Sequence, residues 1–190
     1  MTGFANSRLD PGLLLWVCLA ALAICPPQAR SQAGNEYQVK AIFLYNFTKF
    51  VEWPADPANE PIVIGIIGED PFGNWLDEAI RGKTANGHKL VVRHLKGGEE
   101  ARACQVVFFS ASEVKRLHTT LDSLTGASVL TVGEKEGFAE EGGIINFTLE
   151  DSRVHFEINV DAAQRAGLKI SSKLLSLAKV VRDSGQGGSR

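Results

Sequence analysis

Two glycine-containing segments carry residue types that can bind phosphate. The first, Gly65-Ile66-Ile67-Gly68 followed by Gly73, lies where a dinucleotide-binding fold presents backbone N–H groups to a pyrophosphate. Its first two glycines are three residues apart instead of two, and Asp70 would bring a carboxylate to the phosphate. The second, Gly82-Lys83-Thr84, resembles the end of a P-loop, but Asp77 stands where that motif needs its first glycine. We therefore interpret both segments as structural turns.

The histidines, cysteines and acidic residues also lack the spacing of a catalytic or metal-binding motif. No two of the four histidines are three or four residues apart, the spacing with which one helix face holds zinc. A Gly-x-Ser-x-Gly element is missing, and the acidic run from Glu134 to Glu141 lies in a polar, glycine-flanked connection that is typical of a solvated surface. The sequence thus predicts a protein that is not an enzyme and that uses neither cofactor nor metal.

The first 33 residues have the pattern of a secretory signal peptide. The apolar run Gly12 to Ile24 is shorter than the roughly 20 residues that a membrane-spanning helix needs, and Pro26-Pro27 ends it. Ser31-Gln32-Ala33 offers small residues to a signal peptidase, which predicts cleavage near Ala33 and an exported product. Lipidation of Cys25 is the less favoured alternative, because a bulky isoleucine precedes it.

The remaining chain has the length of one domain, predicted at residues 34–183, with a flexible tail at 184–190. The chain carries 20 Lys and Arg against 22 Asp and Glu, and this balance argues against nucleic acid as a partner. Cys104 is the only cysteine outside the leader, so an exported form has no intramolecular disulfide. We expect its thiol to be buried or half-buried, because it precedes an apolar strand.

The apolar pattern predicts a single layered α/β domain, with a mostly parallel sheet flanked by helices and an antiparallel hairpin near the C-terminus. The expected strands are residues 62–67, 89–95, 105–110 and 128–132, and the hairpin is 143–148 with 153–158. Helices are expected at 36–51, from Asp70 as N-cap to Ile80, at 112–124, from Asp161 as N-cap to Ala166, and from Ser171 or Ser172 through Val181.

The densest aromatic segment of the chain lies in the first of these helices. It contains Phe43, Tyr45, Phe47, Phe50 and Trp53. Steps of three and four place Phe43, Phe47 and Phe50 on one apolar stripe, which predicts that they pack in the core. Tyr45 and Trp53 fall off this stripe, and Lys40 and Lys49 are expected in solvent.

Three segments resemble the YfiR-like family, and the resemblance covers essentially the whole mature chain. They are Lys40-Ala41 with Tyr45-Asn46-Phe47-Thr48-Lys49-Phe50-Val51-Glu52-Trp53-Pro54, Ile64-Gly65 with Asp70-Pro71-Phe72-Gly73, and Ile170-Ser171-Ser172-Lys173-Leu174-Leu175. The resemblance implies an exported α/β domain of Gram-negative bacteria that binds the periplasmic sensor portion of a membrane diguanylate cyclase and represses it. It also implies a possible homodimer, and sequestration of the repressor by an outer-membrane lipoprotein that releases cyclic di-GMP synthesis and biofilm formation. The intramolecular disulfides of the best-known repressor are not carried over, because Cys104 has no partner.

The leading hypothesis is therefore a periplasmic repressor whose partner is the periplasmic domain of an inner-membrane diguanylate cyclase or sensor kinase. The predicted partner surface consists of Phe156, Ile158, Leu168, Ile170, Lys173 and Leu174. The alternative is a periplasmic small-ligand receptor feeding a sensor kinase or a transporter, with its cleft outside the carboxyl ends of the parallel strands. The residues of that predicted cleft are Gly68, Asp70, Phe72, Ser110 and Ser112.

Overall fold

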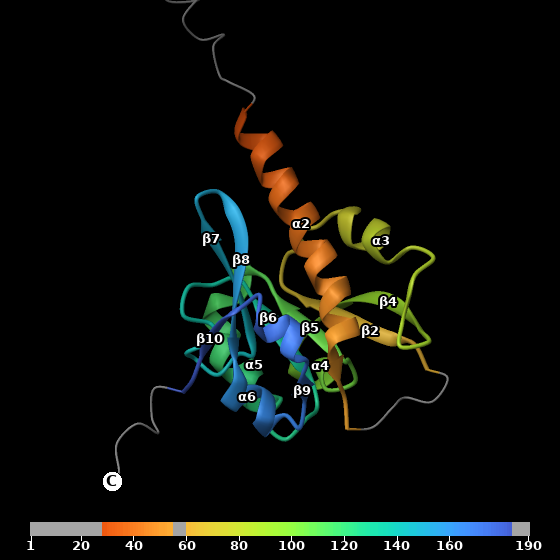
Figure 1. The fold of residues 1–190 in the computed structure, drawn as a ribbon, viewed down its shortest axis with the longest axis vertical. Coiled ribbons are helices and arrows are strands. Elements are labelled where there is room, and N and C mark those ends of the chain that lie inside the picture. The colour runs from red at the N-terminus through yellow and green to blue at the C-terminus, as the bar shows by residue number, and fades with distance from the viewer. Residues whose placement is uncertain (1–27, 55–59, 184–190) are drawn as a thin grey trace, which may run out of the picture. The chain divides into compact units, whose positions relative to one another are not determined.

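The computed structural model describes residues 28–54 and 60–183 (Figure 1). By their contacts, residues 34–190 form one compact unit and residues 1–33 another. Residues 1–27 of the predicted signal peptide lie outside the described residues. The predicted tail at 184–190 lies outside them as well.

An eight-stranded sheet forms the centre of the domain, with the strand order β10-β8-β7-β6-β5-β2-β4-β3. The strands are β2 (Ile62–Ile67), β3 (Thr84–Ala85), β4 (His88–Leu95), β5 (Val106–Phe109), β6 (Leu130–Gly133), β7 (Ile145–Glu150), β8 (Arg153–Asn159) and β10 (Lys179–Val181). Neighbours pair in parallel, except for the antiparallel pairs β3–β4 and β7–β8. A separate small sheet pairs β1 (Val51–Glu52) with β9 (Lys169–Ile170). The predicted mixed α/β fold with its antiparallel hairpin is confirmed.

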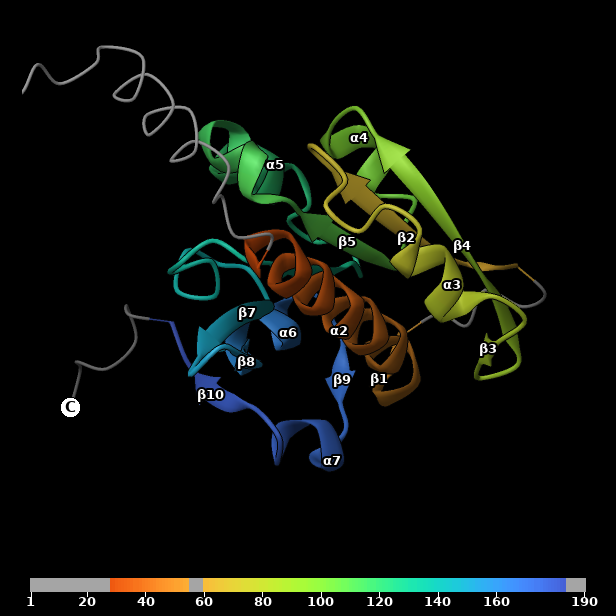
Figure 2. The ribbon, with the colours of Figure 1, turned by 90° about the horizontal axis from the view of Figure 1, so that it is seen from above.

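Helices cover both faces of the central strands (Figure 2). They are α2 (Gln28–Phe50), α3 (Trp75–Ile80), α4 (Gly98–Ala101), the 3₁₀ segment η2 (Ala111–Arg116), α5 (Leu117–Ser123), α6 (Val160–Arg165) and α7 (Ser172–Leu175). Alternate residues of β2 point to opposite faces, so that Ile64 packs with α2 and α3 while Val63 packs with α4 and α5. All six residues of β2 are buried, as a strand covered on both faces requires.

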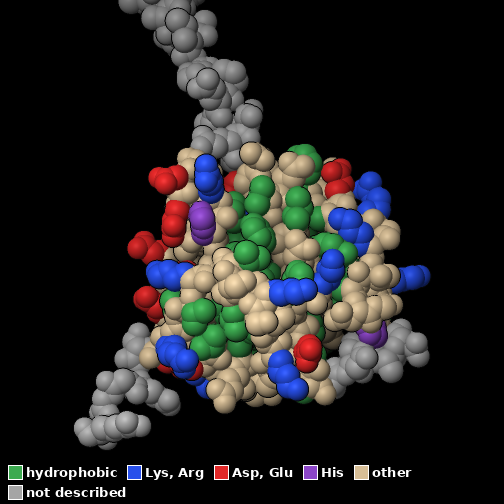
Figure 3. All heavy atoms as spheres, viewed as in Figure 1, with side chains coloured by type: hydrophobic (Ala, Val, Ile, Leu, Met, Phe, Trp, Pro, Cys, Tyr) green, Lys and Arg blue, Asp and Glu red, His purple; other side chains and the backbone are tan. Residues whose placement is uncertain are grey.

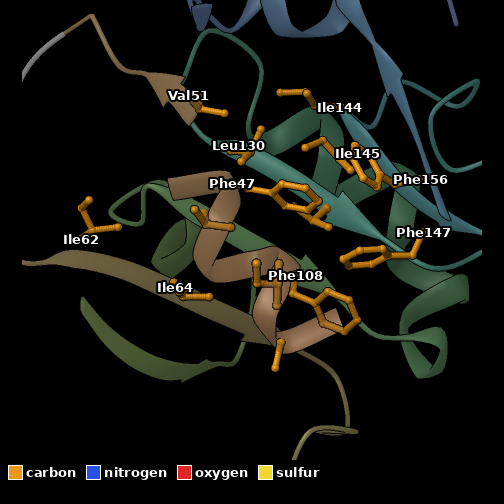
Figure 4. Close-up of a cluster of buried hydrophobic side chains, with 14 of the residues drawn as sticks. Phe47, Val51, Ile62, Ile64, Phe108, Leu130, Ile144, Ile145, Phe147 and Phe156 are labelled. Carbon is orange, nitrogen blue, oxygen red and sulfur yellow. The ribbon is translucent and has the colours of Figure 1, made fainter. Parts of the chain in front are cut away.

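The aromatic stripe of α2 packs on the β7–β8 hairpin (Figure 4). The Phe47 ring is fully buried, with its centroid 5.7 Å from that of Phe147 and 5.2 Å from that of Phe156. Phe43 and Phe50 are half-buried against the same core. The expectation that Lys40 faces solvent is wrong, because its side chain is 5% exposed and ion-paired with Glu134.

Two predicted helix caps differ from the structure. Asp70 does not begin a helix: its Oδ1 accepts a hydrogen bond from the Phe72 N–H at 2.8 Å in a local turn, and α3 starts only at Trp75. The cap of α6 is Asn159, whose Oδ1 accepts from the Ala162 N–H at 2.9 Å, instead of Asp161. Near the start of each helix, the sequence offers more than one side chain whose oxygen could accept the capping hydrogen bond.

The last predicted helix is much shorter than expected. Ser171 caps α7 as predicted, with Oγ accepting from the Leu174 N–H at 3.3 Å, but α7 ends at Leu175. Residues 179–181 instead form β10, which pairs in parallel with β8 at the sheet edge. The helix expected at 112–124 is likewise split into η2 and α5. Pairing with β8 supplies β10 with ladder hydrogen bonds that a local sequence pattern does not reveal.

Candidate functional site

The C-terminal segment of the family resemblance, residues 170–175, lies against the end of α2. Val51 of β1 is paired with Ile170 of β9 in the small antiparallel sheet, and the Ser171 N–H donates to the Phe50 carbonyl at 2.9 Å. The same Ser171 caps α7 with its hydroxyl. Two segments far apart in the sequence, each part of the family resemblance, therefore build one surface.

A shallow apolar hollow of about 360 Å³ opens between α6, β9 and α7. Its lining residues are Val160, Ala163, Gln164, Gly167, Leu168, Lys169, Ile170 and Leu175. The hollow is within the size range of small-molecule sites, at the low end, and is also large enough for an apolar side chain of another protein. We call it the C-terminal hollow.

The structure places the six predicted partner residues at different depths. Phe156, Ile158, Leu168 and Leu174 are core residues, each at most 5% exposed, with the Phe156 ring centroid 5.3 Å from that of Phe43. Only Ile170, which is half-buried, and Lys173, which is exposed, present their side chains at the surface. The four buried residues thus shape the surface from below, because the same apolar stripe that suggested recognition is needed for packing.

Three exposed apolar side chains that were not predicted lie on α2 and in the C-terminal segment. Leu177 is 70% exposed and Val180 is 48% exposed, and Ile42 on the outward face of α2 is 47% exposed. Figure 3 shows hydrophobic side chains gathered over α2 and over the C-terminal segment near β10. Leu177 could have been found from the sequence only if the early end of α7 had been known.

The residues of the predicted ligand cleft do come together at the carboxyl ends of β2 and β5. Gly68 follows β2 with φ +93°, and a Cβ on it would clash with the Ser112 hydroxyl and lie 3.2 Å from Ser110 Cβ. Ser112 Oγ accepts from the Glu69 N–H at 2.9 Å and lies 3.5 Å from Ser110 Oγ. The chain leaves β2 toward β4 on one side, while β5 pairs on the other, so this is the switch point of the sheet.

The other two predicted cleft residues have structural contacts. Phe72 is 1% exposed, and its ring packs edge-on against Phe108 at 4.8 Å and Tyr37 at 5.7 Å. Asp70 Oδ2 lies 2.8 Å from His94 Nε2 on β4. These contacts hold the β2–α3 connection in place.

A buried ion pair lies beside this edge and was not anticipated from the sequence. Lys40 Nζ is 2.7 Å from Glu134 Oε2 and 2.5 Å from Glu36 Oε1. Glu134 Oε1 accepts hydrogen bonds from the Ala111 N–H at 3.1 Å and from the Tyr37 hydroxyl at 3.4 Å. Burial and the nearby carboxylates raise the pKa of the Tyr37 phenol far above its usual value. One feature of the chain does point to this ion pair: Glu134 directly follows β6, whose four residues are all buried.

The described residues offer no evident catalytic set. Within residues 28–54 and 60–183, no group of three or more His, Cys, Asp and Glu side chains is placed to hold a metal ion. Cys104 is 3% exposed, as expected, and burial raises the pKa of its thiol, which disfavours a nucleophilic thiolate. No helix in the described part of the chain is both long and apolar enough to cross a membrane.

The fold and these surfaces define a doubly wound α/β domain suited to binding. It is similar to a conserved domain protein from Vibrio cholerae O1 biovar El Tor, with 12% identity, a TM-score of 0.53, and coverage of 76% of this chain and 59% of the other. It is also similar to the ABC domain, in complex with L-Trp, from Streptococcus pneumonia, with 12% identity, a TM-score of 0.52, and coverage of 77% and 60%. The chain thus spans about three fifths of each protein, and at this identity the likeness concerns the fold alone.

The particular family is given by the sequence itself. Residues 37–179 match the model of the YfiR/HmsC-like family, and the chain belongs to that family. The family consists of periplasmic proteins that are regulatory rather than catalytic and that are linked to cyclic di-GMP signalling. The predicted family is confirmed.

Proposed function

We propose that this chain is exported by its signal peptide and represses an inner-membrane diguanylate cyclase by binding the periplasmic domain of that enzyme. The observation that carries the proposal is the match of residues 37–179 to the YfiR/HmsC-like family. A sensor kinase is the second kind of membrane partner that fits. An outer-membrane lipoprotein that sequesters the repressor, and a homodimer, belong to the same proposal.

Repression of this kind needs no chemistry from the chain. A sensor domain with two conformations shifts toward the one that the repressor binds more tightly. A differential affinity of roughly 3 kcal/mol moves such an equilibrium by over a hundredfold. The buried core of α2 and the β7–β8 hairpin supports this role, because a rigid binder stabilises one partner conformation better than a pliable one.

The partner surface that we propose is the C-terminal hollow with the exposed residues around it. Ile170 lines the hollow, while Lys173 and Leu177 lie next to it on the exposed side of the same segment. A matching partner would insert an apolar side chain into the hollow and place a carboxylate near Lys173. Interfaces typically join such an apolar centre to a charged rim.

The proposal is tested first by deleting the gene in a strain that expresses a candidate cyclase. We expect cellular cyclic di-GMP to rise, and to return to its original level when the gene is restored. An unchanged level, with the cyclase shown to be present, would remove the diguanylate cyclase from the proposal.

The surface is tested by charge reversal with a matched control. Lys173→Glu and Leu177→Glu should each weaken binding to the purified periplasmic domain by about tenfold or more, because each would place a carboxylate in the interface. Lys89→Glu on β4 and Leu149→Glu at the hairpin change exposed residues of the same types elsewhere and should leave binding unchanged. Unchanged binding in both Lys173→Glu and Leu177→Glu would place the interface elsewhere.

A small-ligand receptor is the second candidate, favoured by the two serine hydroxyls 3.5 Å apart at the switch point of the sheet. A thermal-shift screen with nucleotides and amino acids tests it. A stabilising ligand whose effect is lost in Ser110→Ala and Ser112→Ala would support this function, and the absence of any such ligand would count against it.

A further inference from the structure

An acidic cleft of about 630 Å³ lies between the N-terminal half of α2, the loop after β6 and the β7–β8 hairpin. Its charged lining consists of Glu36, Glu134, Glu136, Glu140, Glu150 and Glu157, with Lys40 and Lys179. Figure 3 shows acidic side chains along the edge of the molecule beside the hairpin. The volume is in the middle of the range of small-molecule sites.

The two lysines leave much of this negative charge unbalanced. Lys40 is paired with Glu36 and Glu134, and Lys179 Nζ lies 2.7 Å from Glu157 Oε1. Glu136, Glu140 and Glu150 form no ion pair with any residue in the described ranges. The pKa of Lys179 is raised first by its hydrogen bond to Glu157 and further by the charges of Glu150 and Glu140. A bound group with positive charge would relieve the repulsion among these carboxylates.

A buried acceptor without a partner also lines the cleft. Asn146 on β7 is 1% exposed, and its side-chain oxygen accepts no hydrogen bond within the described part of the chain. A buried polar atom without a partner destabilises the folded state, so its retention calls for a reason. A ligand that donates an N–H to Asn146 would supply the missing bond. This observation is separate from the acidic charge, and it favours a donor group over a simple ion.

The apolar part of the lining favours an aliphatic ligand. Leu149, which is 54% exposed, lines the cleft from β7 of the hairpin together with Phe147. A metal ion fits less well, because the carboxylates are not grouped as ligands to one centre in the residues described. We propose that this cleft binds a small linear polyamine, whose ammonium groups pair with Glu136, Glu140 and Glu150 and donate a hydrogen bond to Asn146.

Titration calorimetry of the exported protein with spermidine tests the proposal. We expect one spermidine per chain, an affinity that falls as salt is added, and a raised melting temperature. Glu140→Gln and Glu150→Gln should each weaken binding about twofold to fivefold, as exposed ion pairs do. Glu78→Gln on α3, the same change outside the cleft, should bind as the wild type does.

Asn146→Leu separates binding from folding. Replacing an unpartnered buried amide by an apolar side chain of similar size should leave the melting temperature of the free protein unchanged or higher, while spermidine binding weakens. Wild-type affinity in Asn146→Leu, or equal affinities in the Glu140→Gln, Glu150→Gln and Glu78→Gln variants, would overturn the proposal. So would binding of calcium chloride at this cleft in place of spermidine.

Discussion

Lys40 Nζ and Glu134 Oε2 lie 2.7 Å apart, and each side chain is only 5% exposed. The pair joins α2 to the end of β6, two elements that are distant in the sequence. Since Glu134 also accepts from the Ala111 N–H, the pair reaches the end of β5 as well. Removing Lys40 would leave Glu134 buried without an opposite charge, whereas removing Glu134 would leave Lys40 paired with Glu36.

We therefore expect Lys40→Met to lower the free energy of unfolding by about 3–5 kcal/mol. The double variant Lys40→Met with Glu134→Leu should lose less than the two single variants together, because Glu134 then no longer remains as a buried charge without Lys40. Urea denaturation measures all three. Lys49→Met, on the exposed side of α2, is the matched control and should change stability by about 0.5 kcal/mol at most. Similar losses in Lys40→Met and Lys49→Met would contradict the role of the pair.

Tyr37 should resist ionisation in the folded protein. Burial, then the charge of Glu134, raises the pKa of its phenol above the ordinary value of 10.0. The folded state thus holds this proton more tightly than the unfolded state, so the stability it contributes is present below pH 10 and is lost as the pH rises further. The measurement is the tyrosinate absorbance of the wild type compared with Tyr37→Phe. A difference that develops near pH 10, while the protein remains folded, would count against this environment.

Asp183 should make the free energy of unfolding depend on pH in the acidic range. Its hydrogen bonds from Arg165, and then from Asn159, lower the pKa of its carboxyl from 3.8. The unfolded chain therefore binds the proton more readily, so the contribution is present above about pH 4 and disappears as the pH falls through the lowered pKa. Urea denaturation between about pH 2 and pH 5 should show a flatter dependence in Asp183→Asn than in the wild type. Parallel curves for the two proteins would show that the carboxylate is not linked to folding.

Asn159 should be among the most sensitive polar positions. Its side chain is fully buried, caps α6, and donates to the Ala139 carbonyl at 2.7 Å and to Asp183 Oδ1 at 2.8 Å. Asn159→Ala removes the cap and leaves a buried carbonyl unsatisfied, which should cost about 2–4 kcal/mol.

Asp161→Ala tests the residue that was predicted from the sequence as the N-cap of α6. Its carboxylate is partly exposed and does not cap α6, so the loss should be about 1 kcal/mol or less. Thermal or urea denaturation of the two variants side by side decides between Asn159 and Asp161 as the cap. A greater loss in Asp161→Ala would support the cap predicted from sequence.

Much of the sheet could be predicted because its signals are local. The apolar run 62–67 is the buried central strand β2, and the two alternating runs near the C-terminus are the antiparallel hairpin of β7 and β8. Cys104 was expected to be buried, and it is. The residues of the predicted ligand cleft meet at one edge, because parallel strands end on the same side of a sheet.

The predicted partner residues show the limit of the same reasoning. An apolar position on a helix or strand gives the same sequence pattern whether it faces the core or another protein. In the structure, Phe156, Ile158, Leu168 and Leu174 lie in the core. The strands β1, β9 and β10 have two or three residues each, too few for a periodic signal, and exist through pairing with distant segments.

By itself, the sequence determined the family, the order of the main strands and helices and the single cysteine of residues 34–183, because each depends on residue types or on spacing along the chain. Only the tertiary structure decided that Lys40 turns inward to Glu134, that β9 joins the end of α2, and that the Asn146 side-chain oxygen, beside an acidic cleft, accepts no hydrogen bond from the described residues. These relationships depend on which distant groups meet in space, and burial then decides whether a charge or an amide must find a partner.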